Sequence, residues 1–211
     1  MIGGIIFCLV FGYLCGSISS GFIISKICRV DVRQHGSGNL GATNVMRTLG
    51  VVAGVFTLLG DLAKCFIPIL LVRYLLFPDF AAFSYESQLL VLYTALGTVL
   101  GHNFPFYLKF HGGKGITCMG AGMLLFDWRL ALVGIITFVL IVAVTRYVSA
   151  ASLFESVFFP VWVAFFCKSG LHMILVACMF TVLAFYTHRA NIKRLINGNE
   201  NKIGARKKEQ K

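Results

Sequence analysis

The sequence predicts an all-α membrane protein, a compact bundle of about seven transmembrane helices, with the N-terminus outside and the C-terminus in the cytoplasm. Hydrophobic residues make up 58% of its 211 residues and charged residues only 13%, and the mean hydropathy is +0.84. These values are typical of multi-span membrane proteins and not of soluble globular domains. Apolar windows long enough to cross a bilayer core of about 30 Å recur through the chain.

The apolar segments follow one another with short polar connections. The first begins at the N-terminus, which lacks the positive region and the cleavage site of a secretory signal, so we expect it to be a retained span. The fourth is short, and the alternative to a full crossing is a half-span or a tilted helix that opens from a loop within the membrane. The expected spans are residues 2–25, 51–77, 88–101, 116–126, 130–145, 152–167 and 171–187.

Three polar segments lie between or after these spans, at residues 36–47, 101–115 and 188–202. With seven crossings, an even number of spans separates each polar segment from the next, so all three face the same compartment. That side carries most of the 19 Lys and Arg residues. By the positive-inside rule, the three polar segments therefore face the cytoplasm.

Small residues at helical spacing predict close packing between spans, because a missing side chain lets two helices approach. The seven Cys residues lie singly, mostly inside apolar segments, and are interpreted as small packing residues. We expect one polytopic membrane domain over residues 1–203, followed by a basic, disordered cytoplasmic tail over residues 204–211. The G-x-x-x-G pairs are Gly12/Gly16, Gly50/Gly54 and Gly97/Gly101.

The first polar segment, GSGNLGATNVMR, is the longest run of small and polar residues between two apolar segments. Its glycines expose backbone N–H groups that can surround an anion, and Ser37, Thr43 and two Asn residues add side-chain donors. Arg47 supplies a charged fork suited to phosphate. The formal match to G-x-G-x-x-G is rejected, because that dinucleotide motif follows a strand and here a membrane span precedes it. We predict an anion site in place of a plain connector.

The second polar segment ends in HGGKG, just before an apolar helix. A phosphate at the N-terminus of that helix would have Lys114 beside it. The segment is not a Walker A loop, which needs Gly at position 108 and Ser or Thr at position 115. Its aromatic residues are interpreted first as an interfacial belt, and second as the wall of an acyl-chain groove.

The third polar segment begins with His188 at the end of the last span. Asn191 follows three residues later on the same helical face, so both side chains can reach a site at the level of the lipid headgroups. The basic residues Arg189, Lys193 and Arg194 are interpreted as positive-inside anchors.

Asp61 and Lys64 lie three residues apart inside an otherwise apolar span. Charges inside a membrane are expensive and usually mark function. We expect a structural ion pair or a role that supports the site. The alternative is a place on the path of a proton-coupled transporter.

Together, GSGNLGATNVMR, GHNFPFYLKFHGGKGI and HRANIKRLINGNENK resemble the three cytoplasmic motifs of the bacterial acyl-phosphate-dependent glycerol-3-phosphate acyltransferases, the PlsY-type enzymes. Their order and spacing fit from about residue 37 to residue 202. The resemblance implies a multi-pass enzyme of the bacterial inner membrane with its active site on the cytoplasmic face. It would move a fatty acyl group from acyl phosphate to the 1-hydroxyl of sn-glycerol 3-phosphate, giving lysophosphatidic acid, the first intermediate of phospholipid synthesis.

The resemblance also implies which residues form the site. Leu40 stands where the family motif usually has Pro, which would loosen the turn, and His111 stands where it usually has Lys, which removes a positive charge. The catalytic residues implied are Ser37, Arg47, Lys114 and His188. The substrate- and phosphate-binding residues implied are Gly38, Asn39, Thr43, Asn44, Gly112, Gly113, Asn191 and Glu200.

The chemistry agrees with these residue types. Acyl phosphate carries a good leaving group, so the protein mainly has to hold two phosphates and orient a hydroxyl. Ser37 or His188 can position or deprotonate that hydroxyl, and the leaving phosphate is a third candidate for the base. No His is followed by Asp five residues later, so the H-x-x-x-x-D signature of acyl-CoA-dependent acyltransferases is absent, which favours acyl phosphate as the donor. No cofactor or metal is implied, because no cluster has ligand spacing.

Other function classes fit less well. The net charge of +11 indicates an anionic partner, but nucleic acid is the weakest candidate because the basic residues form no long face. A small membrane transporter for a phosphorylated solute is the rival class, and it would need polar residues along several spans. A lipid-binding scaffold is the third class, and it does not explain why donors gather in three separate segments.

Overall fold

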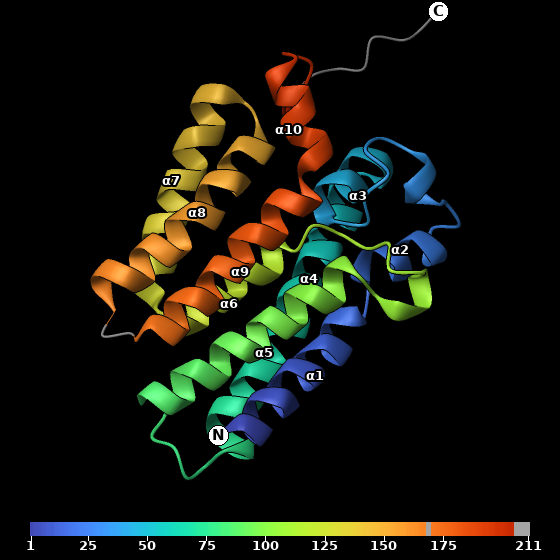
Figure 1. Cartoon of the computed structure of the whole chain (residues 1–211). Coiled ribbons are helices and arrows are strands. Elements are labelled where there is room, and N and C mark those ends of the chain that lie inside the picture. Colours follow the sequence, from blue (N-terminus) through green and yellow to red (C-terminus); the bar gives the residue numbers. More distant parts are fainter. Residues whose placement is uncertain (168–169, 205–211) are drawn as a thin grey trace, which may run out of the picture.

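The computed structural model describes residues 1–167 and 170–204, and these residues form helices and turns with no strand (Figure 1). Of the tail predicted over residues 204–211, only Gly204 lies within the described part. Short turns of 3-10 helix occur at Val32–Gln34 and Phe106–Leu108, and a π-helical turn, Val72–Leu76, extends α4. The helices are α1 (Ile2–Ser17), α2 (Ser20–Ile27), α3 (Ala42–Leu49), α4 (Val51–Leu71), α5 (Tyr85–Asn103), α6 (Ile116–Phe126), α7 (Trp128–Thr145), α8 (Val148–Phe166), α9 (Leu171–Thr187) and α10 (Arg189–Ile196).

The described residues contain five helical segments long and apolar enough to cross a membrane, or six if α9 and α10 are counted as one bent span. These two helices meet at an angle of 63°. With 11 residues, α6 is shorter than a full crossing requires. The all-helical membrane fold is confirmed, whereas the count of seven crossings and the orientation of the two termini stay predictions.

The first candidate span, Ile2–Ile27, contains a break between α1 and α2. The break leaves backbone carbonyl groups without partners inside the helix, and such groups are costly in a membrane. Side chains from other helices satisfy them: Tyr107 Oη donates to the carbonyl of Ser17 at 2.8 Å, and Lys64 Nζ donates to that of Ile18 at 3.0 Å. The broken backbone is therefore held by distant parts of the chain.

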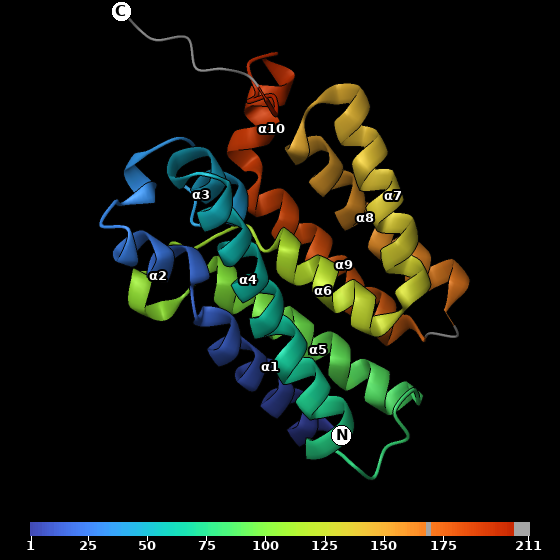
Figure 2. The ribbon, with the colours of Figure 1, turned by 180° about the vertical axis from the view of Figure 1, so that it is seen from behind.

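α5 is the central helix, with 78% of its most apolar window buried, and it packs against α1, α4, α6 and α9 (Figures 1 and 2). Its contact with α1 is close because glycines face the other backbone. A Cβ atom at Gly16 would lie 2.2 Å from the carbonyl oxygen of Thr98, and one at Gly101 would lie 2.1 Å from that of Tyr13. The packing role predicted for Gly12/Gly16 and Gly97/Gly101 is confirmed, whereas Gly50 of the third pair faces open space and, with φ of +93°, forms the turn between α3 and α4.

Replacing Gly16 with Ala is expected to lower the Tm. The new methyl group would clash with the α5 backbone, and the clash is relieved only if α1 and α5 move apart. Overpacking of this kind costs about 1–3 kcal/mol. Thermal unfolding in detergent measures the effect. Gly120→Ala is the matched control, since a Cβ atom there meets nothing within 4 Å, and its better helix propensity predicts an equal or higher Tm. Equal losses in both variants would contradict the close contact.

The three polar segments lie at one end of the bundle, the end at which α3 and α10 are found (Figure 1). The N-terminus and the connection between α4 and α5 lie at the opposite end, and the view from behind shows the same separation (Figure 2). Segments more than 60 residues apart in the sequence, such as those that contain Lys114 and Asn191, thereby come into contact.

Candidate active site

A cavity of about 390 Å³, here called the polar cavity, lies where the three polar segments meet. A second cavity, of about 800 Å³, borders the same loops. Gly38, Gly112 and Gly113 line the second cavity and not the first, and Asn39 lines both. The predicted site residues that line the polar cavity are Ser37, Asn39, Thr43, Asn44, Arg47, Lys114, His188, Asn191 and Glu200.

Asn44 shapes the first polar segment from within. Its side chain is almost fully buried, and its Oδ1 accepts the backbone N–H of Ser37 at 2.8 Å. Its Nδ2 lies 2.9 to 3.1 Å from the carbonyl oxygens of Val32, His35 and Asn39. The amide therefore closes the loop, and this leaves the Ser37 side chain exposed at the cavity.

The loop leads directly into α3, whose first residues line the polar cavity. The first N–H groups of a helix have no partner in the helix and attract anions. One turn later, Arg47 is exposed and forms no hydrogen bond or ion pair with any residue that the structure describes. This segment thus presents helix N–H groups and an unengaged guanidinium to the same space.

Lys114 enters from the second polar segment. Gly115, with φ of +77°, turns the chain into α6 directly after it, a conformation that glycine adopts without strain. The Lys114 ammonium donates to Oδ1 of Asn191 at 2.7 Å. Burial lowers the pKa of Lys114 to about 8, and the charge of Glu200 opposes this shift. The α6 N-terminus and Lys114 therefore lie on one wall of the cavity.

Glu200 ties the third segment together. One of its oxygens, Oε1, accepts from Asn191 Nδ2 at 2.7 Å and from Ser149 Oγ at 3.2 Å. The other, Oε2, accepts from Arg194 Nε at 2.6 Å. Because Asn191 also binds Lys114, the carboxylate fixes the lysine through one amide side chain. Arg194, predicted as a membrane anchor, lines the cavity and pairs with Glu200.

His188 lies just beyond the end of α9, with only 2% of its surface exposed. Its Nδ1 is 2.8 Å from the carbonyl oxygen of Ala184. A carbonyl can only accept, so Nδ1 carries the proton and Nε2 has the free lone pair. Burial, with the positive charge of Lys114, lowers the pKa of His188 to about 4. The ring is therefore neutral at physiological pH and offers one hydrogen-bond acceptor.

The two departures from the family motif lie away from the polar cavity. Leu40 is buried in a small core with Val32, Val45 and Leu108. Its side chain therefore packs this loop against the second polar segment. His111 is exposed and lines the second cavity, with Nδ1 2.6 Å from the carbonyl oxygen of Lys109.

Several lining residues lie outside the predicted set. Ser149 and Ser152, one turn apart at the start of α8, line the cavity, and the only sequence signal for them is two serines at helical spacing. Asp61 and His102 also line it. Asp61 was predicted only as half of an ion pair or as a residue that supports the site, and His102 lies at the start of the second polar segment.

Part of the wall of the polar cavity is apolar. Large apolar residues of α3, α4, α6, α7 and α8 line it. These residues are Met46, Leu58, Ile116, Phe138 and Val148. One space thus offers cationic groups, N–H groups and hydrocarbon.

A family model described as glycerol-3-phosphate acyltransferase matches residues 6–198. The chain belongs to this family. A glycerol-3-phosphate acyltransferase of Clostridioides difficile is 41% identical over 202 residues, which cover 94% of this chain and 95% of that protein. The glycerol-3-phosphate acyltransferase of Bacillus subtilis is 35% identical, covering 92% and 95% of the two chains.

Solved structures of a glycerol-3-phosphate acyltransferase agree with this membership. The crystal structure of PlsY (YgiH), an integral membrane glycerol 3-phosphate acyltransferase, in its glycerol 3-phosphate form matches with a TM-score of 0.83 and 35% identity, covering 95% of this chain and 96% of that one. The lysophosphatidic acid form matches with a TM-score of 0.80 and 34% identity. The acyltransferase function predicted from the three motifs is confirmed, and the transporter alternative is set aside.

Proposed function

We propose that this acyltransferase takes its acyl group from acyl phosphate and transfers it to the 1-hydroxyl of sn-glycerol 3-phosphate in the polar cavity. The products are lysophosphatidic acid and inorganic phosphate. The observation that carries the proposal is that Arg47, Lys114 and the N-termini of α3 and α6 surround one space, part of whose wall is apolar. Two phosphates and a fatty chain need this combination of groups.

The polar groups of the cavity are of two kinds, charged side chains and neutral hydrogen-bonding side chains. Arg47, which has no partner among the described residues, and Lys114, which is fixed by Asn191, are the charged clamps for the phosphates. Ser37 and Asn39 at the cavity supply neutral hydrogen bonds. The fatty chain lies along the apolar lining toward α7 and α8. Such an arrangement holds both substrates with their reacting atoms close, which is the main requirement for an already activated donor.

In the reaction, the hydroxyl oxygen of the acceptor attacks the carbonyl carbon of acyl phosphate. The bond between that carbon and the phosphate oxygen breaks, and inorganic phosphate leaves. His188 Nε2 accepts a hydrogen bond from the hydroxyl and orients it, whereas the low pKa of His188, about 4, makes it a weak proton acceptor. The proton therefore passes to an oxygen of the leaving phosphate, which becomes more basic as its bond to the carbonyl carbon breaks. Lys114 stabilises the charge that develops on the phosphate oxygens.

The proposal includes a membrane topology. We infer seven crossings by α1, α4, α5, α6, α7, α8 and α9 in the bacterial inner membrane, with the N-terminus outside and the polar cavity on the cytoplasmic face. The N-terminus and α10 lie at opposite ends of the bundle, which supports an odd number of crossings (Figure 1). The basic residues of those segments support the cytoplasmic side. Residues 1–203 form one domain in this arrangement.

The test is release of inorganic phosphate by the purified protein supplied with palmitoyl phosphate, with and without glycerol 3-phosphate. We expect release that depends on the acceptor and matches the lysophosphatidic acid formed. Palmitoyl-CoA in place of palmitoyl phosphate is the control for the donor and is expected to give no product. Lysophosphatidic acid formed from palmitoyl-CoA and glycerol 3-phosphate, with none formed from palmitoyl phosphate, would overturn the proposed donor.

The activity is expected to fall as the pH rises through about 8. Burial lowers the pKa of Lys114 to that value, with Glu200 opposing the shift and Arg194 and Arg47 adding to it. The free enzyme therefore loses this positive charge above pH 8, and kcat/KM reports the free enzyme. Lys114→Arg, which stays charged, is expected to remove the fall. The same alkaline fall in both proteins would show that another group titrates.

A further inference from the structure

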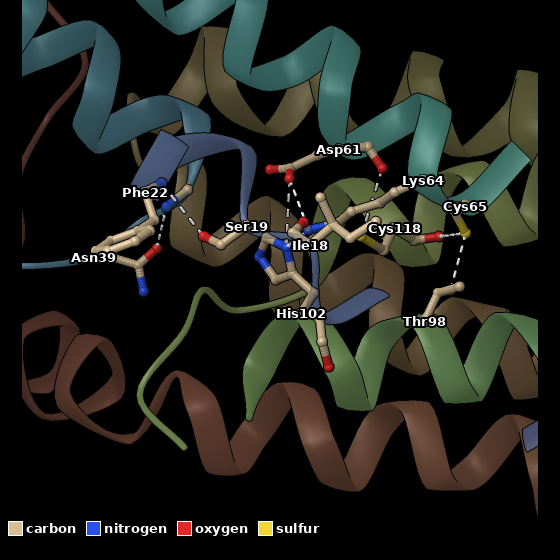
Figure 3. Close-up of polar contacts among 12 residues, drawn as sticks. Ile18, Ser19, Phe22, Asn39, Asp61, Lys64, Cys65, Thr98, His102 and Cys118 are labelled. Atoms are coloured by element: carbon tan, nitrogen blue, oxygen red, sulfur yellow. Dashed lines mark hydrogen bonds and ion pairs between the residues drawn. The ribbon is translucent and has the colours of Figure 1, made fainter. Parts of the chain in front are cut away.

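A buried group of charged and polar side chains lies beneath the polar cavity. Asp61 and Lys64 come from α4 and His102 from α5, and their exposed fractions are 1%, 6% and 7%. Lys64 Nζ is 2.9 Å from Asp61 Oδ1 and 2.7 Å from His102 Nδ1. Figure 3 shows the three side chains turned toward one another. Charges placed this deep in a membrane protein are expensive and usually serve function.

Lys64 contacts three different groups through its ammonium. Its Nζ donates to the carbonyl oxygen of Ile18 at 3.0 Å, forms a hydrogen bond with His102 Nδ1 and forms an ion pair with Asp61 Oδ1. An ammonium has no lone pair, so His102 Nδ1 must accept and the ring proton lies on Nε2. Asp61 Oδ1 also lies 3.6 Å from His102 Nδ1, so one carboxylate faces both basic side chains, which limits the cost of burying them.

His102 links this cluster to the second polar segment. Its carbonyl oxygen accepts the N–H of Gly113 at 2.9 Å, and that of Asn103 accepts the N–H of Gly112 at 3.0 Å. A Cβ atom at Gly113 would lie 1.8 Å from His102 Nε2, and one at Gly112 would lie 2.1 Å from the His102 carbonyl oxygen. The two glycines therefore rest directly on His102, in space that any side chain would need.

We propose that Asp61, Lys64 and His102 are positioning residues that hold the Gly112–Gly113 turn in place and thereby aim Lys114 into the polar cavity. Lys64, on α4, fixes the ring of His102 through their hydrogen bond, and the ring in turn supports the glycine turn that packs on it. The role in turnover rests on the function proposed above for Lys114. The positioning itself is a property of the fold and can be measured without substrate.

The double variant Asp61→Leu/Lys64→Met tests this. Apolar residues in place of a buried ion pair are often neutral or stabilising, so a folded protein is expected. Without the cluster, the amides of residues 112 and 113 are expected to exchange with deuterium about 10-fold faster or more. The kcat/KM is expected to fall about 10- to 100-fold, because a displacement of about 1 Å costs about 10²-fold. Asp61→Asn, a milder change, should give smaller effects in the same directions and carries the test if the double variant does not fold.

Arg73→Met is the matched control, because Arg73 is also buried and follows the same helix at its other end. It is expected to leave both the exchange at residues 112 and 113 and the kcat/KM unchanged. Unchanged exchange in the double variant would overturn the positioning role, whatever happens to activity. Faster exchange with full activity would overturn its importance for turnover. If the parent protein is inactive with palmitoyl phosphate and glycerol 3-phosphate, the proposed function fails, and the exchange measurement still decides the positioning.

Discussion

Lys114→Met is expected to lower kcat by about 10²- to 10³-fold while the protein stays folded in detergent. The substitution removes a charged donor from a shielded site, where one such donor is worth about 2.7–4 kcal/mol in the transition state. Its side chain is part of the polar cavity and not of the helix packing, so the Tm should change little. Steady-state release of phosphate, with thermal unfolding in the same detergent, measures both quantities.

Lys109→Met is the matched control for this prediction. Lys109 carries the same charge in the same polar segment, but it lines the second cavity. Its loss is expected to change kcat less than about 3-fold. If the two variants lost activity equally, the effect would come from the net charge of the segment, and the placement of a phosphate at Lys114 would be wrong. Arg47→Ala is expected to behave like Lys114→Met.

His188→Ala is expected to lower kcat by about 10²-fold, because Nε2 then no longer orients the attacking hydroxyl. His188→Gln separates orientation from proton transfer, since an amide oxygen accepts a hydrogen bond but is not a useful base. Partial recovery in the Gln variant would support orientation, and equal losses in both variants would identify His188 as the base. His172→Ala is the control, because His172 is bound to Tyr93 Oη at 2.8 Å away from the polar cavity.

Much of the site could be predicted because each motif is short and dense. A run of glycines, hydroxyls and amides between two apolar segments has little to offer a core, so Ser37 and Arg47 could be assigned to a site before any contact was known. Because an even number of predicted spans separates these polar segments, the sequence also predicted that all three lie on the same side of the membrane. The hydrogen bond from Lys114 to Asn191 confirms that the second and third segments meet.

The remaining details depend on helix rotation and loop path, which local patterns do not contain. Asn44 is equally suited to bind a ligand or to close a loop, and only the fold shows that its amide nitrogen contacts loop carbonyl groups. The contact of Lys64 with His102 joins residues 38 positions apart on different helices, so the sequence offered only the pair of Asp61 and Lys64. With 11 residues, α6 is also too short for its sequence to show whether it crosses the whole membrane.

The position of Glu200 has a consequence for how the enzyme is made. Its carboxylate binds Asn191 and, through it, Lys114, yet it lies beyond the last membrane helix. Chains are synthesised and fold from the N-terminus, so the first polar segment is made long before Asn191 and Glu200. A ribosome-bound chain that ends before α10 would hold a membrane bundle without a complete site, and catalysis becomes possible only after residue 200 has been added.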